Sequence, residues 1–559
     1  MLGFLRRLVV GLLALIGLAA VLVTVFAFVA GHFVLRYLAE EEMPASAVLE
    51  LRLGDGIVEA ADGLPLARLR GQLTLAGMVQ AIDRAAGDAA VTGLLIDLSG
   101  ARLGLAQAQE LAQAVRRFAA AGKPTTAFAD SFGELGGGLP AYLVAAAADT
   151  VAMQPSGTWA VTGVAVDQPF LGRALAAIGL GVDVVQRHEF KAAAEPLSRD
   201  SLSPAARANL QALVDDLLAA AIDDLAAGRR QAAAAIRAAI DRAPLTAAEA
   251  LAAGLVDRLA YYPDLTGGRR LGTLAHYAAG SSQGEVALVT LSGMITREGF
   301  SPGQGADAVA RALDAAREDA GVRAVVLRID SPGGAYAPSD AIRAAVLRLR
   351  AAGKPVVAWM GNLAASGGYF AAMAADRIIA QPATITGSVG VVGAKPDPSG
   401  LLAHAGIGVD GVAAGANARA GSLLRGMTPA EHARFEALID AAYADFTAKL
   451  AADRGLAPDA LDRAARGRVF AGTAARQAGL ADRLGGLGEL REELRGLLKL
   501  PAGAPVTLRP YPEGPGSLRQ VLRALRQGEL TAALSQLAAG LAEAALVAVP
   551  QPLLLAPLR

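Results

Sequence analysis

Cysteine is absent from this 559-residue sequence, which excludes disulfides, thiol nucleophiles and cysteine-ligated metal sites. Histidine is scarce: the five histidines form neither an H-x-x-x-H nor an H-E-x-x-H pattern, so we expect no histidine-based zinc site. An excess of one charge sign is also missing, because 52 basic residues balance 52 acidic ones. The composition therefore gives no indication of nucleic-acid binding. We predict a protein without metal, cofactor or nucleic-acid partner.

Apolar residues are abundant, at 53% against 19% charged, so a chain of this length can bury several domain cores. Residues 8–35 contain no Asp, Glu, Lys or Arg. This run is longer than the 7–15 apolar residues of a signal-peptide core and long enough for a membrane span of about 20. Arg6 and Arg7 precede the run, which predicts a cytoplasmic N-terminus. We predict that residues 1–44 are a transmembrane anchor and that the remainder is exported.

The sequence after Ala45 repeats itself with a period of roughly 230 residues. The string AAGKP occurs at residues 120–124 and 351–355, and AGLVDRL at 253–259 matches AGLADRL at 478–484. Each copy alternates short apolar runs with alanine-rich helical stretches, which predicts an α/β unit with a mostly parallel sheet. We expect a first copy at residues 45–280, a second at 281–500, and a linker with a helical tail at 501–559.

A candidate nucleophile lies in the second copy. An apolar strand at residues 323–329 is followed by Ser-Pro-Gly-Gly at 331–334, and the next strand, at 355–360, is followed by a helix at 369–375. Ser366 lies at this strand-to-helix turn, with two glycines after it. A hydroxyl at such a turn faces free amides and the positive end of a helix dipole, which suits an anion forming on a substrate. The same residues would also serve as a helix N-cap with turn glycines.

Three motifs in this region, SPGG at 331–334, ASGGY at 365–369 and TGSVG at 386–390, resemble the signal peptide peptidase A (protease IV) family. That family consists of membrane-anchored serine peptidases. The resemblance, which runs from Ala45 to about Leu500, implies an α/β fold of tandem crotonase/Clp-protease-like domains after a transmembrane helix. It also implies that Ser366 is the nucleophile and that Ser388 orients a catalytic lysine. The oxyanion donors would be the backbone N–H groups of Gly333 and Ser366, with Gly334 as the alternative to Gly333.

The lysine is expected in the first copy, in the stretch Phe-Lys-Ala-Ala-Ala-Glu-Pro at residues 190–196. This stretch resembles the family's F/Y-K-x-A-x-E-P motif, which implies that Lys191 is the general base. When the copies are aligned, Leu139 stands opposite Ser366 and Ala416 stands opposite Lys191, so each copy keeps a different half of a dyad. To accept a proton, Lys191 must be neutral, so its pKa must lie well below about 10.4. We therefore expect an optimum at mildly alkaline pH.

The resemblance implies a homotetrameric serine endopeptidase that degrades cleaved signal peptides and other short apolar peptides. It would be a single-pass protein of the bacterial inner membrane, with its catalytic part on the periplasmic side. Two other classes remain open at this point: a crotonase-type enzyme acting on an acyl thioester, and a catalytically silent membrane scaffold. A serine peptidase with a Ser-His-Asp triad is a variant of the serine-peptidase prediction, and His404 is the only histidine suitably placed for it.

Overall fold

A computed structural model describes residues 46–54, 56–59, 73–134, 136–267, 271–278, 285–299 and 305–512, together with Gly17. The predicted anchor at 1–44, apart from Gly17, and the predicted tail helix lie outside these residues. Within the described ranges, none of the helices combines the length and the apolar character that a membrane crossing requires.

The first copy is built on a six-stranded sheet in the order β8-β4-β3-β2-β1-β9, in which every pairing is parallel. The parallel arrangement follows from helical crossovers between successive strands. Its strands are β1 (Ala47–Arg52), β2 (Val91–Asp97), β3 (Thr125–Ala129), β4 (Thr150–Met153), β8 (Arg258–Leu259) and β9 (Leu271–Thr273). Its helices are α3 (Leu75–Ala86), α4 (Leu105–Ala120), α5 (Leu139–Ala145), α9 (Ala233–Arg242), α10 (Ala247–Ala252), α11 (Tyr262–Thr266) and α12 (Ala275–Ala278).

The second copy is built on an eight-stranded sheet along the path β16-β14-β12-β11-β10-β18, with β13 and β17 branching from β12. Its pairings are parallel except for β14 with β16. The strands are β10 (Val286–Ser292), β11 (Ala324–Ser331), β12 (Val356–Ala365), β13 (Arg377–Ala380), β14 (Ile385–Gly387), β16 (Val469–Ala471), β17 (Arg483–Leu484) and β18 (Leu508–Pro510). Strand β18 lies in the predicted linker, so this sheet continues past the boundary that we expected at Leu500.

The remaining helices of the second copy are α13 (Ala306–Glu318), α14 (Tyr336–Ala351), α15 (Gly367–Ala372), α18 (Pro458–Ala464), α19 (Gly472–Gln477) and α20 (Leu487–Leu498). One long helix in each copy, α8 (Pro204–Arg229) and α17 (Pro429–Arg454), has the same length and the same start. Ser203 caps α8 and Thr428 caps α17, each through its side-chain oxygen, and a proline opens each helix. The duplication read from the sequence is therefore present in the fold.

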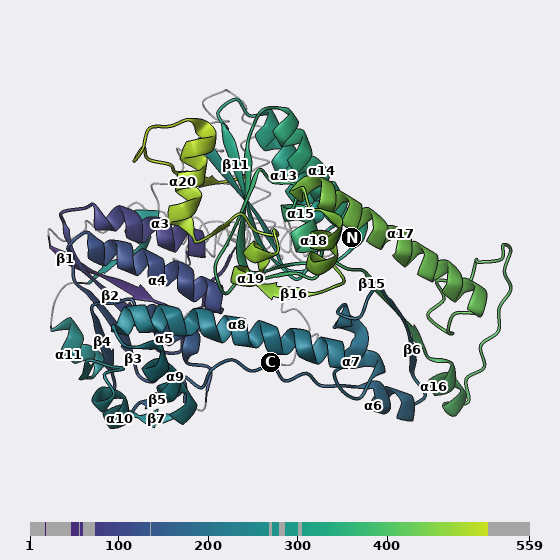
Figure 1. The fold of residues 1–559 in the computed structure, drawn as a ribbon, viewed down its shortest axis with the longest axis horizontal. Helices are drawn as coiled ribbons and strands as arrows, with labels where there is room; N and C mark the ends of the chain where they lie inside the picture. The colour runs from purple at the N-terminus through teal and green to yellow at the C-terminus, as the bar shows by residue number, and fades with distance from the viewer. Residues whose placement is uncertain are drawn as a thin grey trace, which may run out of the picture.

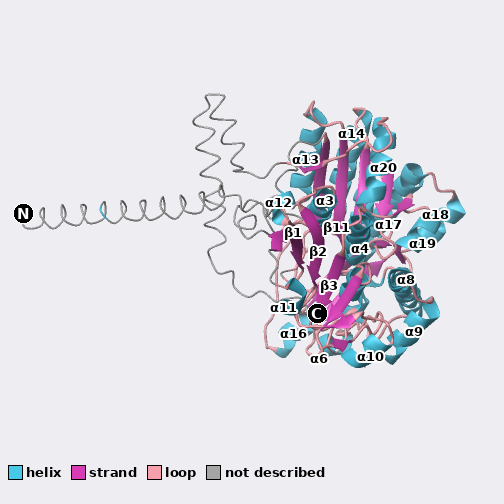
Figure 2. Cartoon of the chain, turned by 90° about the vertical axis from the view of Figure 1, so that its left-hand side faces the viewer, coloured by secondary structure: helices cyan, strands magenta, loops and turns pink. Residues whose placement is uncertain are grey.

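The two copies pack against each other through one continuous hydrophobic core. It joins Leu49 and Ile96 of the first sheet with Val326 and Trp359 on one face of the second sheet. Helix α4 lies between the two sheets, while α13 and α14 cover the opposite face of the second sheet (Figure 1). The second view shows the strands of the two sheets, from β1 and β2 to β11, within one body (Figure 2). The copies therefore hold each other in a fixed relation.

A projecting arm also joins the copies. Strand β6 (Gly181–Gln186) of the first copy pairs antiparallel with β15 (Val392–Asp397) of the second. Short helices accompany the ribbon: α6 (Gly172–Ala177), α7 (Glu195–Ser198) and α16 (Ser399–His404), seen at the lower right of Figure 1. Because β6 leads into Lys191 and β15 follows Ser388, the arm brings these two residues toward the same place.

Candidate active site

Ser366 occupies a strained turn between β12 and α15. Its backbone has φ 54° and ψ −118°, a conformation that residues other than glycine rarely adopt. The Ser366 N–H donates to the Gly387 carbonyl oxygen at 2.8 Å, which ties the turn to β14. The expectation that this N–H serves as an oxyanion donor is therefore wrong, because it already has a partner.

Lys191 reaches Ser366 from the other copy. Its Nζ lies 3.0 Å from Ser366 Oγ, 2.9 Å from Ser388 Oγ and 2.8 Å from the Ser388 carbonyl oxygen. Only 5% of the lysine surface is exposed, and this burial lowers the pKa of the Lys191 amine to about 8. A substantial fraction of the amine is therefore neutral near that pH.

The three contacts of Lys191 Nζ suit both of its protonation states. An ammonium has three N–H donors, which Ser366 Oγ and the two Ser388 oxygens would accept. A neutral amine has two N–H donors and one lone pair, so it can donate to the two Ser388 oxygens and accept from the Ser366 hydroxyl. The arrangement can therefore take up and return a proton at Ser366 Oγ without losing a hydrogen bond.

Two glycines leave room for the Lys191 side chain. A Cβ on Gly467 would lie 2.5 Å from the Lys191 backbone nitrogen, and a Cβ on Gly390 would lie 3.2 Å from Lys191 Cδ. Gly467 also has φ +85°, which disfavours any side chain. In the sequence, Gly390 stands out only as the end of the TGSVG motif, and Gly467 belongs to none of the three motifs.

Unengaged backbone amides lie beside Ser366. Gly333 has φ +97°, and a Cβ there would lie 2.5 Å from the Gly367 nitrogen, so only glycine fits. The Gly333 N–H donates to Ser331 Oγ at 3.1 Å. The N–H groups of Gly334 and Gly367, by contrast, have no hydrogen-bond partner among the described residues. Gly367 opens α15, where the first amides of a helix are free, whereas we expected from the sequence that this helix begins only at residue 369.

The remaining acidic and histidine candidates lie away from the reacting atoms. Glu195 of the lysine motif is buried and accepts from the Ser203 N–H at 3.0 Å, so it fastens the segment after Lys191 to the start of α8. His404 ends α16 on the arm, where its side chain is exposed. Among the described residues, no hydrogen bond joins a histidine to Ser366, so the geometry gives no support to a histidine base.

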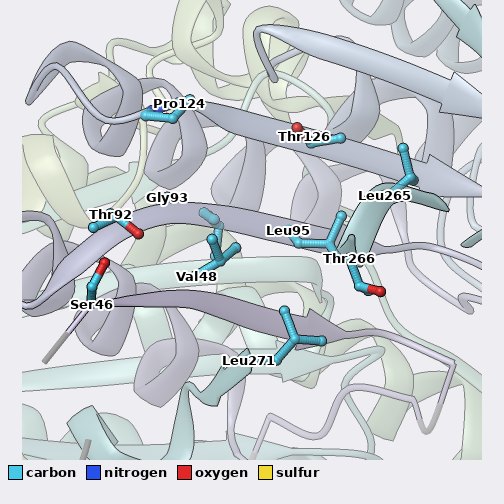
Figure 3. A pocket seen from close by; sticks show the side chains of 11 residues that line it. Ser46, Val48, Thr92, Gly93, Leu95, Pro124, Thr126, Leu265, Thr266 and Leu271 are labelled. Carbon is cyan, nitrogen blue, oxygen red and sulfur yellow. The ribbon is translucent and has the colours of Figure 1, made fainter. Parts of the chain in front are cut away.

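A cavity of about 540 Å³ lies elsewhere, against β1, β2, β9 and α11 of the first copy (Figure 3). Its walls are aliphatic side chains, hydroxyls and backbone, and they contain neither a carboxylate nor a histidine. The lining residues are Ser46, Val48, Thr92, Gly93, Leu94, Leu95, Pro124, Thr126, Leu265, Thr266 and Leu271. Ser366, Lys191 and Ser388 are not among them, so this cavity is separate from the candidate site.

The sequence of this chain is similar to those of known peptidases. The model of peptidase family S49 matches residues 117–268 and again residues 348–501. Protease 4 of Salmonella typhi is 30% identical over 453 residues, covering 76% of this chain and 72% of the relative. A putative signal peptide peptidase SppA of Enterococcus faecium is 31% identical over 175 residues, covering 30% of this chain and 49% of the relative.

Among solved structures, a ClpP1 variant of Listeria monocytogenes has a TM-score of 0.24 and 15% identity, covering 36% of this chain and 92% of its own. That likeness is too low to identify the fold, so the crotonase/Clp-like assignment stays a prediction beside the observed α/β architecture. The family match extends over more than half of the sequence and falls once on each copy, in agreement with the internal repeat. The chain belongs to peptidase family S49 and is a serine peptidase.

Proposed function

We propose that this peptidase cleaves peptide bonds with a Ser/Lys dyad in which Ser366 is the nucleophile and Lys191 the general base. The observation that carries the proposal is the 3.0 Å contact between Lys191 Nζ and Ser366 Oγ, made by an amine that burial keeps partly neutral. The acyl-thioester and silent-scaffold readings are set aside, because the chain belongs to a peptidase family.

In the acylation step, Lys191 Nζ accepts the proton of the Ser366 hydroxyl while Oγ bonds to the carbonyl carbon of the scissile peptide. The carbonyl π electrons move to oxygen and form an oxyanion. When the tetrahedral intermediate collapses, the C–N bond breaks and the Lys191 ammonium returns its proton to the leaving nitrogen. A water molecule then attacks the acyl-enzyme with the same amine as base, which releases the acid product and restores Ser366.

The oxyanion would be stabilised by backbone N–H groups beside Ser366. Those of Gly334 and Gly367 have no hydrogen-bond partner in the described chain, which supports them as the donors. Gly333 keeps a role in the site by letting the two glycine loops approach, since a side chain there would collide with Gly367. Ser388 holds the Lys191 amine through its hydroxyl and its carbonyl, which aims the lone pair at Ser366 Oγ.

The substrates we propose are cleaved signal peptides and other short apolar peptides. Two features support this: one relative is named a putative signal peptide peptidase, and the apolar run at residues 8–35 would keep the enzyme where such peptides are released. The same run and its basic flank support a single-pass anchor in the bacterial inner membrane with the catalytic part in the periplasm. Protease added to spheroplasts should then digest the catalytic part, and complete protection there would reverse the topology.

We also propose the homotetramer that the family resemblance implies. The first copy covers the face of the second sheet that carries Val326 and Trp359. At the spacing of the AAGKP repeat, the corresponding position to Val326 is Leu95, on the face of the first sheet that borders the cavity of Figure 3. A neighbouring chain packed there would repeat the contact that the two copies make within one chain.

The dyad is tested by covalent labelling. A fluorophosphonate probe should modify Ser366, as read by peptide mass spectrometry, and the labelling rate should fall in a Lys191→Ala variant. Label on another residue, or labelling of Ser366 that does not depend on Lys191, would show that the assignment is wrong.

A further inference from the structure

In the arm, β6 pairs with β15, but the two segments that correspond to these strands by the repeat form no such pair in the described structure. Helices α6 (Gly172–Ala177) and α16 (Ser399–His404) are equivalent by the repeat and lie 227 positions apart, the same spacing as β4 and β13. At this spacing β6 corresponds to residues 408–413, and β15 corresponds to residues 165–170. Within the chain β6 pairs with β15, whereas 165–170 and 408–413 form no strand in the described structure.

Equivalent residues on these segments differ strongly in burial. Val185 of β6 is 3% exposed, and Val412, which occupies the corresponding place in the second copy, is 101% exposed. Val166 and Val409 are also exposed, at 50% and 38%. A fully exposed valine in a sequence that elsewhere forms a paired strand indicates that a pairing surface is left open.

The backbone contacts of the arm show the same asymmetry. The Gly179 carbonyl accepts from the Leu401 N–H at 2.7 Å, and Gly179 has φ +79°. Its equivalent, Gly406, has φ +71°, but a Cβ there would meet nothing within 4 Å. The turn has therefore kept its conformation without the neighbour that occupies it in the first copy.

An aspartate occurs at the same position of both copies, and in the first copy it makes a polar contact. Asp183 Oδ2 accepts from the Met427 N–H at 3.0 Å, which ties β6 to the loop before α17. Its equivalent is Asp410, which accepts only from the adjacent Gly411 N–H in the described chain and is exposed. Since α8 and α17 are equivalent, the position corresponding to Met427 is Leu202, before α8.

We propose that residues 408–413 of one chain pair antiparallel with residues 165–170 of a second copy of this chain, repeating the β6–β15 ribbon between subunits. The inference rests on the proposed oligomer and identifies a surface that builds it. The register follows from the intrachain ribbon, where Val185 lies opposite Gly393. Val412 therefore lies opposite Val166 of the partner subunit, and Asp410 accepts from the N–H of Leu202 of the partner subunit.

This contact is head-to-tail, because each chain offers 408–413 on one side and 165–170 on the other. Such heterologous contacts continue from chain to chain until a ring closes. The arm thus gives every subunit two neighbours through segments that are otherwise unpaired.

The lack of native cysteine makes disulfide trapping a clean test. In antiparallel strands, opposed Cα atoms lie about 4.5–5.5 Å apart, within the 4.4–6.8 Å range of disulfides. Full-length protein carrying both Val166→Cys and Val412→Cys, oxidised in detergent, should give a ladder of linked chains on non-reducing gels. A mixture of the two single variants should give dimers only, and Val166→Cys paired with Val409→Cys, which is out of register, should link at least about tenfold more slowly.

An internal control uses the ribbon that is already formed. Val184 and Ala394 are opposed in the β6–β15 register, so Val184→Cys with Ala394→Cys should link within one chain and leave the mass monomeric. If this control links and the 166/412 pair does not, the proposed strand pairing is wrong. If native mass spectrometry still shows the oligomer, the failure concerns only this surface; if it shows monomers, the proposed oligomer fails as well.

A second variant tests the same surface in case the double-cysteine protein fails to fold. Val412→Asp changes a side chain that is fully exposed in the single chain, so the fold should be retained. Burying this carboxylate against the partner should weaken self-association at least about tenfold, measured by sedimentation at a series of concentrations. Unchanged association of a folded Val412→Asp protein would overturn the proposal.

Discussion

The Nζ atom of Lys191 lies 3.0 Å from Ser366 Oγ, although 175 residues separate them in the sequence and each belongs to a different copy of the repeat. Two structural features bring them together: the core that joins the sheets, and the antiparallel β6–β15 ribbon that crosses from one copy to the other. The duplicated chain therefore contains both halves of the proposed dyad. Neither copy has a second set, because Leu139 and Ala416 stand at the equivalent positions.

Removing either member of the dyad should abolish peptide hydrolysis. Ser366→Ala and Lys191→Ala should each lower kcat by about 1,000-fold or more, because removing one member of a catalytic dyad costs nearly as much activity as removing both. Lys191→Arg should be as inactive as Lys191→Ala, since a guanidinium stays protonated. Hydrolysis of a fluorogenic peptide measures the loss, and substantial turnover by any of the three folded variants contradicts the assignment.

Activity should rise with pH through the ionisation of Lys191. The burial that lowers the pKa of this amine to about 8 makes the base form minor below that pH, so kcat/KM should fall about tenfold per unit there. His404→Ala should leave the profile unchanged, because the exposed His404 side chain makes no hydrogen bond to Ser366. A profile governed by a group near pH 6.5 and lost in His404→Ala would favour a histidine base.

Burial of Lys191 should also cost stability in a pH-dependent way. Its pKa falls from the ordinary 10.5 to about 8, so between these values the unfolded chain binds more protons than the folded one, and stability rises with pH. The cost is fully present below pH 8. Lys191→Met has no buried ammonium and therefore lacks this cost. The free energy of unfolding of wild type should then rise by about 2 to 3 kcal/mol relative to that of the variant between pH 7 and pH 10.

The stability difference can be measured by urea unfolding of wild type and Lys191→Met across that pH range. Lys499→Met, at an exposed lysine at the end of α20, is the matched control and should run parallel to wild type. If the difference in the free energy of unfolding between wild type and Lys191→Met did not change with pH, the Lys191 amine would not be desolvated in the folded protein.

Gly467→Ala should reduce activity by displacing Lys191, because the new methyl group would lie 2.5 Å from the lysine backbone. Gly455, at the end of α17, is a matched control: it has φ +63° but meets nothing within 4 Å. Both alanines incur the backbone strain of a positive φ, of about 1 kcal/mol, but only one touches the site. Equal kcat values for the two variants would show that Gly467 does not position the lysine.

Much of the site could be predicted because its parts lie in short motifs. Short motifs that resemble the family predicted Ser366, Ser388 and Lys191 as site residues, and the repeat predicted that Ser366 and Lys191 lie in different copies. The engagement of the Ser366 N–H was missed, because it depends on the register of β14 against β12, which places Gly387 beside Ser366. Gly467 was missed for a similar reason: its contact with Lys191 crosses 276 positions and leaves no local pattern.

Element types were predicted better than element lengths. The strand expected at 355–360 continues to Ala365, because β11 and β12 resume pairing at Ser331 and Ala364 after an irregularity that follows Ile329. Helix α14 can begin at Tyr336 although Pro338 follows, since Pro338 falls in its first turn, where no intrahelical N–H bond is required. Strand β18 was taken for a linker because a three-residue edge strand carries almost no apolar pattern of its own.

The final prediction concerns the number of chains that build one site. Lys191 and Ser366 meet within one polypeptide here, so each subunit of the proposed oligomer should carry its own complete dyad. Oligomers assembled from Ser366→Ala and Lys191→Ala subunits should then remain inactive, because no chain in them contains both groups. Distinct affinity tags on the two variants, purified in sequence, would establish that mixed oligomers are being assayed. Recovery of a sizeable fraction of wild-type activity would mean that the dyad is shared between chains, contrary to the intrachain contact; inactivity would agree with one independent site per subunit.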